Sequence, residues 1–280
     1  MLPEHPTLQV VTVQTGQRYP DLWVRRLAAM VARNLSANHH FIVYTDRPEA
    51  KRFGLDSPRH QQLEVKDLQA SGLRGFFGKL RLFDQNLTGS DPFLFLDSTL
   101  VVRSSLMPLV NHGRTGNSSV IGVRDWNYPI LNSSVLWCQP GPQMQAVWEA
   151  WQRKLYDSTL FPGDQNFIFH VFNMQAPSAL SYWPEGWVGS YKALRKLAAR
   201  DPGAAQQALE ACAILKFHGR PKPDEVLHPW RHPRRTILRY PLQPRLWSYL
   251  ADEVGHHWHE REPQTKCPTE NAALKTTQTG

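Results

Sequence analysis

The sequence reads Phe93-Leu-Phe-Leu-Asp97-Ser-Thr99-Leu-Val-Val between residues 93 and 102, and this stretch decides the fold. Four consecutive apolar residues predict a buried strand, which ends in a carboxylate followed two residues later by a hydroxyl. A charge at the end of a buried strand is costly unless it is paired, hydrogen-bonded or bound to a metal. Ligands of open α/β sheets also bind at such strand ends. Asp97 is therefore either an ordinary turn residue or part of a ligand site, and local sequence leaves both open.

The residues around this stretch alternate between strand and helix patterns. Apolar runs predict strands at 8–14, 40–45, 63–65, 120–123 and 135–137. Helical periodicity appears at 21–35, 76–86, 143–156, 167–172 and 244–253. No linker or internal repeat interrupts them, so we expect one α/β domain over residues 1–254, with a mixed, mostly parallel central sheet flanked by helices. Residues 255–280 are polar and are expected to form a disordered tail.

Composition limits the environment and the partners of the chain. Basic residues outnumber acidic ones by 32 to 24, and the segment 231–245 carries five arginines without an acidic residue. Such a segment is either a solvated face or a contact for anions, including a membrane surface, while nucleic acid is not expected. Three widely spaced cysteines suggest no disulfide framework, and neither a signal peptide nor a membrane span is apparent. We therefore expect a cytoplasmic protein, with possible peripheral membrane contact through 231–245.

The order of motifs resembles that of a known enzyme family. Gly78-Lys79-Leu-Arg-Leu-Phe precedes the deciding strand, and Asp97-Ser98-Thr99 follows it. The chain here is similar to the A-type glycosyltransferases of the nucleotide-diphospho-sugar transferase superfamily, and most closely to the family of glycogenin and bacterial lipopolysaccharide galactosyltransferases. In that family a lysine begins a helix, a buried strand follows, and the strand ends in Asp-x-Asp. The resemblance implies the A-type fold and a nucleotide-sugar donor.

Four further elements, in the same order, extend the resemblance over residues 8 to 223. They are Thr12-Val-Gln-Thr-Gly-Gln-Arg-Tyr19, Asn132-Ser133, Gly163-Asp164-Gln165-Asn166 and Lys216-Phe-His218-Gly219-Arg-Pro-Lys222-Pro223. In the family they correspond to the nucleotide-binding first loop, an Asn-Ala/Ser-Gly turn, an Asp-Gln element beside the sugar, and a C-terminal His-Phe-x-Gly-x-x-Lys-Pro motif. Five elements in order are more specific than any one of them.

The resemblance implies a role for each matching residue. The nucleotide and its phosphates would contact Thr12, Gln14, Tyr19, Lys79, Asn132, Gly219 and Lys222. A Mn²⁺ or Mg²⁺ ion would bind to Asp97, Thr99 and His218. Catalysis would involve Asp164 and Gln165. Lys192 lies outside the matching motifs and is a further catalytic candidate, expected beside the acceptor. The family further implies a UDP-sugar donor and transfer that retains anomeric configuration.

Two departures from the family pattern concern the metal. Thr99 stands where the second carboxylate belongs, and a neutral hydroxyl is a weaker ligand for a hard cation. Lys216 stands in the place of the metal-binding histidine, two residues before His218; in an extended segment both would face the same side. Three alternatives follow: a metal held by Asp97 and His218, an enzyme that works without metal, or a nucleotide-sugar-binding pseudoenzyme or scaffold.

The acceptor is the part of the reaction about which the sequence says least. Saccharide, lipid-linked and protein acceptors all remain open. Trp126, Trp183 and Trp187 are candidates for stacking on sugar rings, although aromatic residues more often lie in the core.

Overall fold

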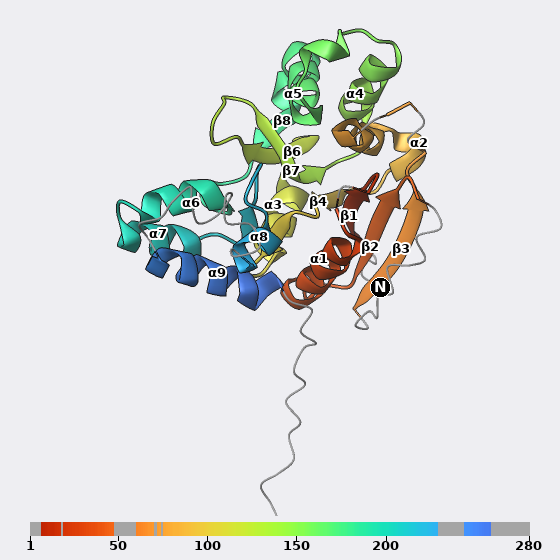
Figure 1. Cartoon of the computed structure of the whole chain (residues 1–280). Coiled ribbons are helices and arrows are strands. Elements are labelled where there is room, and N and C mark those ends of the chain that lie inside the picture. Colours follow the sequence, from red (N-terminus) through yellow and green to blue (C-terminus); the bar gives the residue numbers. More distant parts are fainter. Residues whose placement is uncertain are drawn as a thin grey trace, which may run out of the picture.

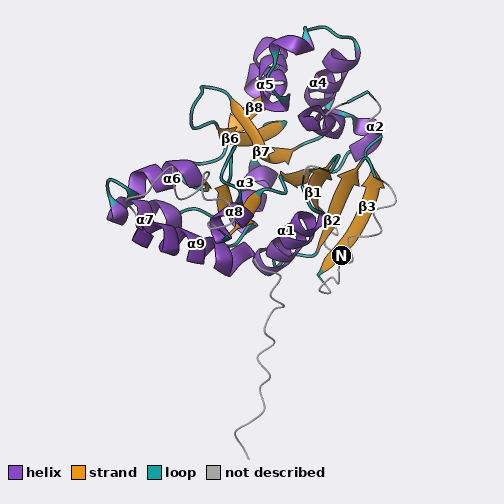
Figure 2. Cartoon of the chain, in the orientation of Figure 1, coloured by secondary structure: helices purple, strands orange, loops and turns teal. Residues whose placement is uncertain are grey.

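The computed structural model describes residues 7–17, 19–47, 60–69, 72–73 and 75–228, and the helix 244–258, whose side chains are described from residue 251. Two β-sheets form the centre of this structure, and helices cover them (Figures 1 and 2). The basic segment 231–245 lies outside the residues whose side chains are described, as does the chain after residue 258.

The larger sheet has seven strands in the order β3-β2-β1-β4-β7-β6-β8. Its strands are β1 (Leu8–Gln14), β2 (His39–Thr45), β3 (Gln61–Asp67), β4 (Phe93–Leu96), β6 (Val120–Arg124), β7 (Leu131–Cys138) and β8 (Leu180–Tyr182). β1 to β4 run parallel, β7 runs antiparallel to both of its neighbours, and β8 is parallel to β6. The sheet is therefore mixed and mostly parallel, with helices on its faces, as the sequence predicted.

Helices pack on both faces of this sheet because its central strands are apolar on both sides. Val10 and Leu94 belong to a buried cluster with α1 (Asp21–Asn34), α3 (Met107–Thr115) and the second sheet. Their chain neighbours Val11 and Phe95 belong to the opposite cluster, with α4 (Pro142–Gln152) and α5 (Asp164–Gln175). This alternation follows from the two-residue period of a strand. It fixes β4 between two layers, so that Asp97 emerges at a defined point of the sheet edge.

The second sheet has three strands in the order β5-β10-β9. Its strands are β5 (Leu100–Val102), β9 (Val188–Ser190) and β10 (Ile214–Lys216). β10 is antiparallel to β5, with Lys216 opposite Leu100, and parallel to β9, with Lys216 opposite Ser190. Around this sheet lie α6 (Tyr191–Ala198), α7 (Pro202–Glu210), α8 (Pro223–Leu227) and α9 (Pro244–Trp258), which group on one side in Figure 1.

Two predicted segments differ from the structure. The helix expected at 76–86 is a 3₁₀ helix, η2 (Gly75–Phe83), followed by the short α2 (Gln85–Thr88); the Asp84 side chain accepts a hydrogen bond from the Asn86 backbone and starts a new helix there. α9 extends to Trp258, beyond the helix expected at 244–253, and the fully buried Trp258 makes a T-shaped contact with Trp23. The remaining short elements are η3 (Ser158–Leu160) and η4 (Pro177–Ala179). No helix in the described part of the chain is long and apolar enough to cross a membrane.

Candidate active site

A cavity of about 320 Å³ opens where the ends of β1, β4 and β10 meet η2, β7 and the start of α5. Its volume lies in the range of small-molecule sites. Eleven of the thirteen predicted site residues line it: Gln14, Tyr19, Lys79, Asp97, Thr99, Asn132, Asp164, Gln165, His218, Gly219 and Lys222. Thr12 is fully buried within β1 and lies outside the lining, and Lys192 lies in a neighbouring hollow. The chain thus gathers most of the predicted residues at one strand-end cavity.

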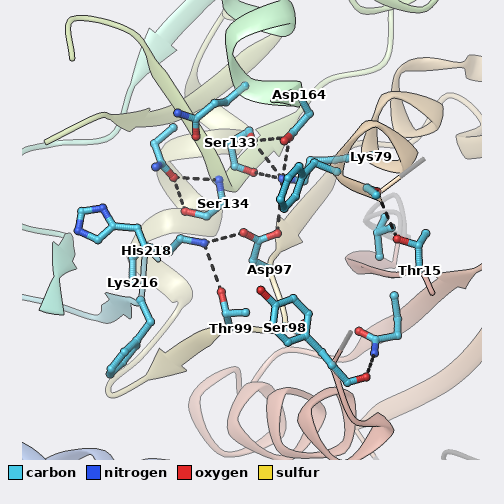
Figure 3. Close-up of a pocket in the computed structure, with 18 of the residues that line it drawn as sticks. Thr15, Lys79, Asp97, Ser98, Thr99, Ser133, Ser134, Asp164, Lys216 and His218 are labelled. Carbon is cyan, nitrogen blue, oxygen red and sulfur yellow. Dashed lines mark hydrogen bonds and ion pairs between the residues drawn. The ribbon is translucent and has the colours of Figure 1, made fainter. Parts of the chain in front are cut away.

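Asp97 lies between two ammonium groups, one on each carboxylate oxygen (Figure 3). Lys79 Nζ is 3.4 Å from Oδ1, and Lys216 Nζ is 2.6 Å from Oδ2. Burial alone would raise the pKa of Asp97, but Lys216 and Lys79 outweigh it and lower the pKa to about 2. The Asp97 side chain is still 27% exposed, so this ion pair faces the cavity and is not sealed in the core.

Lys79 connects Asp97 to Asp164 through a buried cluster. Its ammonium lies 2.9 Å from Asp164 Oδ2 and donates to both the backbone oxygen and the hydroxyl of Ser133, while the Ser133 hydroxyl donates to Asp164 Oδ2 at 2.7 Å. Burial would lower the pKa of Lys79, but the carboxylates of Asp164 and Asp97 outweigh burial and raise it. Sequence reasoning did not identify Ser133 as a site residue; its position beside Asn132 was the available signal.

The start of α5 explains the position of Asp164. Gly163 precedes the helix in extended conformation, and Asp164 occupies the first turn, where a negative charge is favoured by the helix dipole. Both described polar contacts of Asp164 use Oδ2. Asp164 itself lines the cavity, and its side chain is 9% exposed.

The segment after β10 turns sharply and returns a second lysine to the cavity. Gly219 has a φ of +65°, which a residue with a side chain rarely adopts. Pro223 then begins α8, and the fully buried Glu225 accepts a hydrogen bond from the backbone N–H of Lys222 and pairs with Arg220. The Lys222 ammonium donates to the backbone oxygen of Phe217 at 3.3 Å. The Gly-x-x-Lys-Pro pattern thus has a local structural reason: a turn, a cap and a helix start.

Aromatic and amide groups line the end of the cavity near β1. Tyr19 stacks on Trp23 with ring centroids 4.8 Å apart, and the Lys222 ammonium lies 5.4 Å from the Tyr19 centroid. The Gln14 amide donates to the backbone oxygen of Tyr19 at 2.7 Å and holds the loop in place. Asn132, expected in a turn, lies within β7; its amide donates to Asp125 and its oxygen accepts from Ser134.

His218 lies at the boundary between the cavity and a second hollow of about 460 Å³. Its Nε2 is 2.8 Å from the Ser190 hydroxyl, and its ring makes a T-shaped contact with the Trp126 ring at a centroid distance of 5.4 Å. Burial and the charge of Lys192 lower the pKa of His218 to about 4, so that the ring is neutral at pH 7. Of the three candidate tryptophans, Trp126 lines this hollow, whereas Trp183 is buried and donates its indole N–H to a backbone oxygen of β7.

The groups around Asp97 do not fit a divalent-cation site. Mg²⁺ and Mn²⁺ prefer several oxygen ligands, and the negative ones matter most. Asp97 supplies the carboxylate here, Thr99 supplies a neutral hydroxyl, and His218 bonds with Ser190 instead. The position beside both Asp97 and Thr99 is taken by the Lys216 ammonium. Within the described residues, no three His, Cys, Asp or Glu side chains gather closely enough to hold a metal.

Comparison with known proteins gives matches of fold and none of sequence. No family model matches the chain, and no curated protein matches its sequence. A similar structure is the apo form of the glycosyltransferase GlyE of Streptococcus pneumoniae TIGR4, with a TM-score of 0.54 and 17% identity, over 89% of this chain and 63% of that one. Another is the galactosyltransferase LgtC in complex with donor and acceptor sugar analogs, with a TM-score of 0.51 and 12% identity, over 89% of this chain and 95% of that one.

The match covers 56% of the length of a second GlyE structure and 48% of the length of the bifunctional glycosyltransferase WbbM. The chain therefore spans only about half of these proteins. At such low identities the likeness concerns the arrangement of strands and helices. That arrangement agrees with the strand order and the strand-end cavity described above. The chain has the A-type glycosyltransferase fold, as its motifs predicted.

Proposed function

We propose that the protein is a glycosyltransferase that moves a sugar from a nucleoside diphosphate donor to an acceptor hydroxyl. The observation that carries the proposal is the shared cavity of Lys79, Asp97, Asp164 and Lys222. Lysines there suit a diphosphate, and a carboxylate beside them suits a sugar carbon that becomes positively charged. The fold of known sugar transferases supports this assignment.

In this reaction the bond between the anomeric carbon and the diphosphate oxygen breaks, and its electron pair leaves with the diphosphate. The acceptor oxygen bonds to the same carbon, and its proton passes to the departing phosphate. Negative charge grows on the diphosphate during this step, so fixed positive charge nearby lowers the barrier. Lys79 and Lys222 are the predicted residues for that role, and both are largely buried beside the cavity.

Asp164 is proposed to stabilise the positive charge that develops on the sugar. Lys79 and Ser133 hold one carboxylate oxygen, and the residue lines the cavity, where the sugar would lie. Gln165 follows it in the cavity lining and would contact the sugar through its amide. By family resemblance we propose a UDP-sugar donor and retention of configuration. Tyr19 lines the cavity and stacks on Trp23, and we propose that it contacts the nucleotide base.

The acceptor is proposed to enter through the second hollow. His218 lines both spaces, so a sugar held there would approach the donor site. Trp126 lines this hollow, and Lys192, Lys196 and Arg200 follow one another at four-residue spacing along α6 and its C-terminal end. Among the described residues, those that line this hollow include no carboxylate, which favours an acceptor that carries negative charge.

The proposal is tested by a thermal-shift panel of nucleoside diphosphates and their sugars, followed by an assay for nucleoside diphosphate release. Wild-type protein should be stabilised by one donor and should release its diphosphate. Asp164→Asn should keep donor binding and lose at least about 100-fold in turnover, since it removes charge stabilisation at the reacting carbon. Asp91→Asn, an exposed aspartate before β4, is the matched control.

Binding of a donor without turnover in any acceptor mixture would instead favour the pseudoenzyme alternative, which the neutral Thr99 motivates. Absence of binding by every nucleoside diphosphate and sugar donor would overturn both functions.

A further inference from the structure

We propose that the ammonium of Lys216 takes the place of a divalent cation, so that the donor diphosphate binds without metal. This inference rests on the proposed nucleotide-diphosphate site. Its basis is the position of Lys216 Nζ, 2.6 Å from Asp97 Oδ2 and 3.3 Å from Thr99 Oγ1. A cation already occupies the position between the two side chains that a metal would need.

The fold holds Lys216 in this position through strand register. Asp97, Ser98 and Thr99 connect β4 to β5, and β5 pairs with β10 so that Lys216 lies opposite Leu100. β9 pairs with the other side of β10, which leaves the Lys216 backbone between two strands. The residue is only 7% exposed. A charge fixed in this way is already in place when a ligand arrives.

The hydrogen bonds of Lys216 leave one donor for a ligand. An ammonium group has three N–H bonds. Among the described residues, two of them point to Asp97 and Thr99. Because Lys216 also lines the cavity, the third is available to a phosphate oxygen.

The replacement of a carboxylate by Thr99 fits the same account. Among the described residues that line the cavity, Lys79, Lys216 and Lys222 provide three positive charges, against the two negative charges of Asp97 and Asp164. One positive charge remains in excess before a diphosphate binds. A second carboxylate at residue 99 would cancel that excess, whereas a hydroxyl accepts a hydrogen bond from Lys216 without adding charge.

The test uses inorganic pyrophosphate as the probe, because it represents every nucleoside diphosphate whatever the base. Calorimetry in EDTA should show binding to the wild-type protein. Lys216→Met should weaken that binding by about 30-fold, the effect of losing a hydrogen bond to a charged group. Lys66→Met, on the edge strand β3 and away from the cavity, should leave it unchanged.

A double variant keeps the test decisive if Lys216→Met folds poorly. Thr99→Asp combined with Lys216→His supplies metal ligands in place of the ammonium, so it should bind pyrophosphate weakly in EDTA and tightly with Mn²⁺. Electron paramagnetic resonance should show one protein-bound Mn²⁺ in this variant and none in the wild type.

Each outcome has a defined meaning. Wild-type binding of pyrophosphate only with Mn²⁺, or one bound Mn²⁺ per wild-type chain, would overturn the inference and leave the proposed transferase intact. No binding of pyrophosphate under any condition, together with no donor in the thermal-shift panel, would overturn both.

Discussion

The cavity around Asp97 and the hollow beside α6 share His218 in their linings, but the charged side chains of the two spaces differ in burial. In the cavity, Asp97 and Asp164 pair with lysines that are less than one tenth exposed. In the hollow, Lys196 and Arg200 are exposed. Breaking a buried pair leaves an uncompensated charge, whereas an exposed charge is stabilised by water. We therefore expect substitutions in the cavity to change stability most, and substitutions in the hollow to change ligand affinity more than stability.

Asp97→Asn, in the cavity, should lower stability more than any other substitution considered. The substitution leaves the buried Lys216 without its carboxylate partner, so we expect the free energy of unfolding to fall by about 2–4 kcal/mol. The lower part of that range allows for the 27% exposure of the Asp97 side chain. Urea denaturation of this variant, compared with that of the control Asp91→Asn, measures the change in unfolding free energy. Equal stability of the two variants would mean that the lysines find solvent or other partners.

Ser133→Ala should have a smaller effect in the same cluster. The hydroxyl accepts from Lys79 and donates to Asp164, and the residue is 3% exposed. Its loss should cost about 1–2 kcal/mol of unfolding free energy. Ser36→Ala, at an exposed position, serves as the control in the same urea titration. A loss no larger than in the control would show that water replaces the hydroxyl.

The hollow beside α6 should affect ligand choice more than stability. We expect methyl glucuronide to bind better than methyl glucoside by about 3- to 10-fold, because exposed ion pairs each contribute little. Combined Lys196→Gln and Arg200→Gln should remove the preference and change the unfolding free energy by less than about 0.5 kcal/mol. Saturation-transfer NMR with both glycosides measures the ligand preference, and urea denaturation measures the unfolding free energy. Equal binding of the two glycosides to wild-type protein would argue against an anionic acceptor.

The pH dependence of donor binding should be the smallest effect. Asp97 has a pKa of about 2 and His218 of about 4, while the pKa of Lys79 is raised. The two low pKa values keep Asp97 charged and His218 neutral above pH 5, and Lys79 stays protonated. Affinity for the nucleotide-sugar found in the thermal-shift panel should therefore vary less than about 2-fold from pH 5.5 to 8.0. A tenfold change with a midpoint near 6.5 would show that His218 titrates normally.

Sequence predicted those parts of the site that depend on local signals. The four apolar residues of β4 predicted the buried strand that precedes Asp97, because such a run can be recognised from the local sequence alone. Gly219 and Lys222 were named through the resemblance of their segment to a family motif, and the structure shows that the segment forms a turn with a positive φ at Gly219, followed by a helix start. The mixed central sheet with helices on its faces was confirmed as well.

Other features depend on contacts between distant segments. The ion pair of Lys216 with Asp97 joins residues 119 positions apart and depends on the register of β5 with β10, two three-residue strands that the sequence did not predict. α9 was expected to end earlier because its polar histidines conceal the burial of Trp258. Such features follow from tertiary packing, which the periodicity of a short segment does not contain.

A crystal structure of the protein grown with UDP and Mn²⁺, with anomalous data at the manganese edge, tests the central claim most directly. The account predicts a diphosphate oxygen within about 3 Å of Lys216 Nζ and no manganese signal beside Asp97. A manganese peak about 2.1 Å from Asp97, with Lys216 turned away, would contradict it.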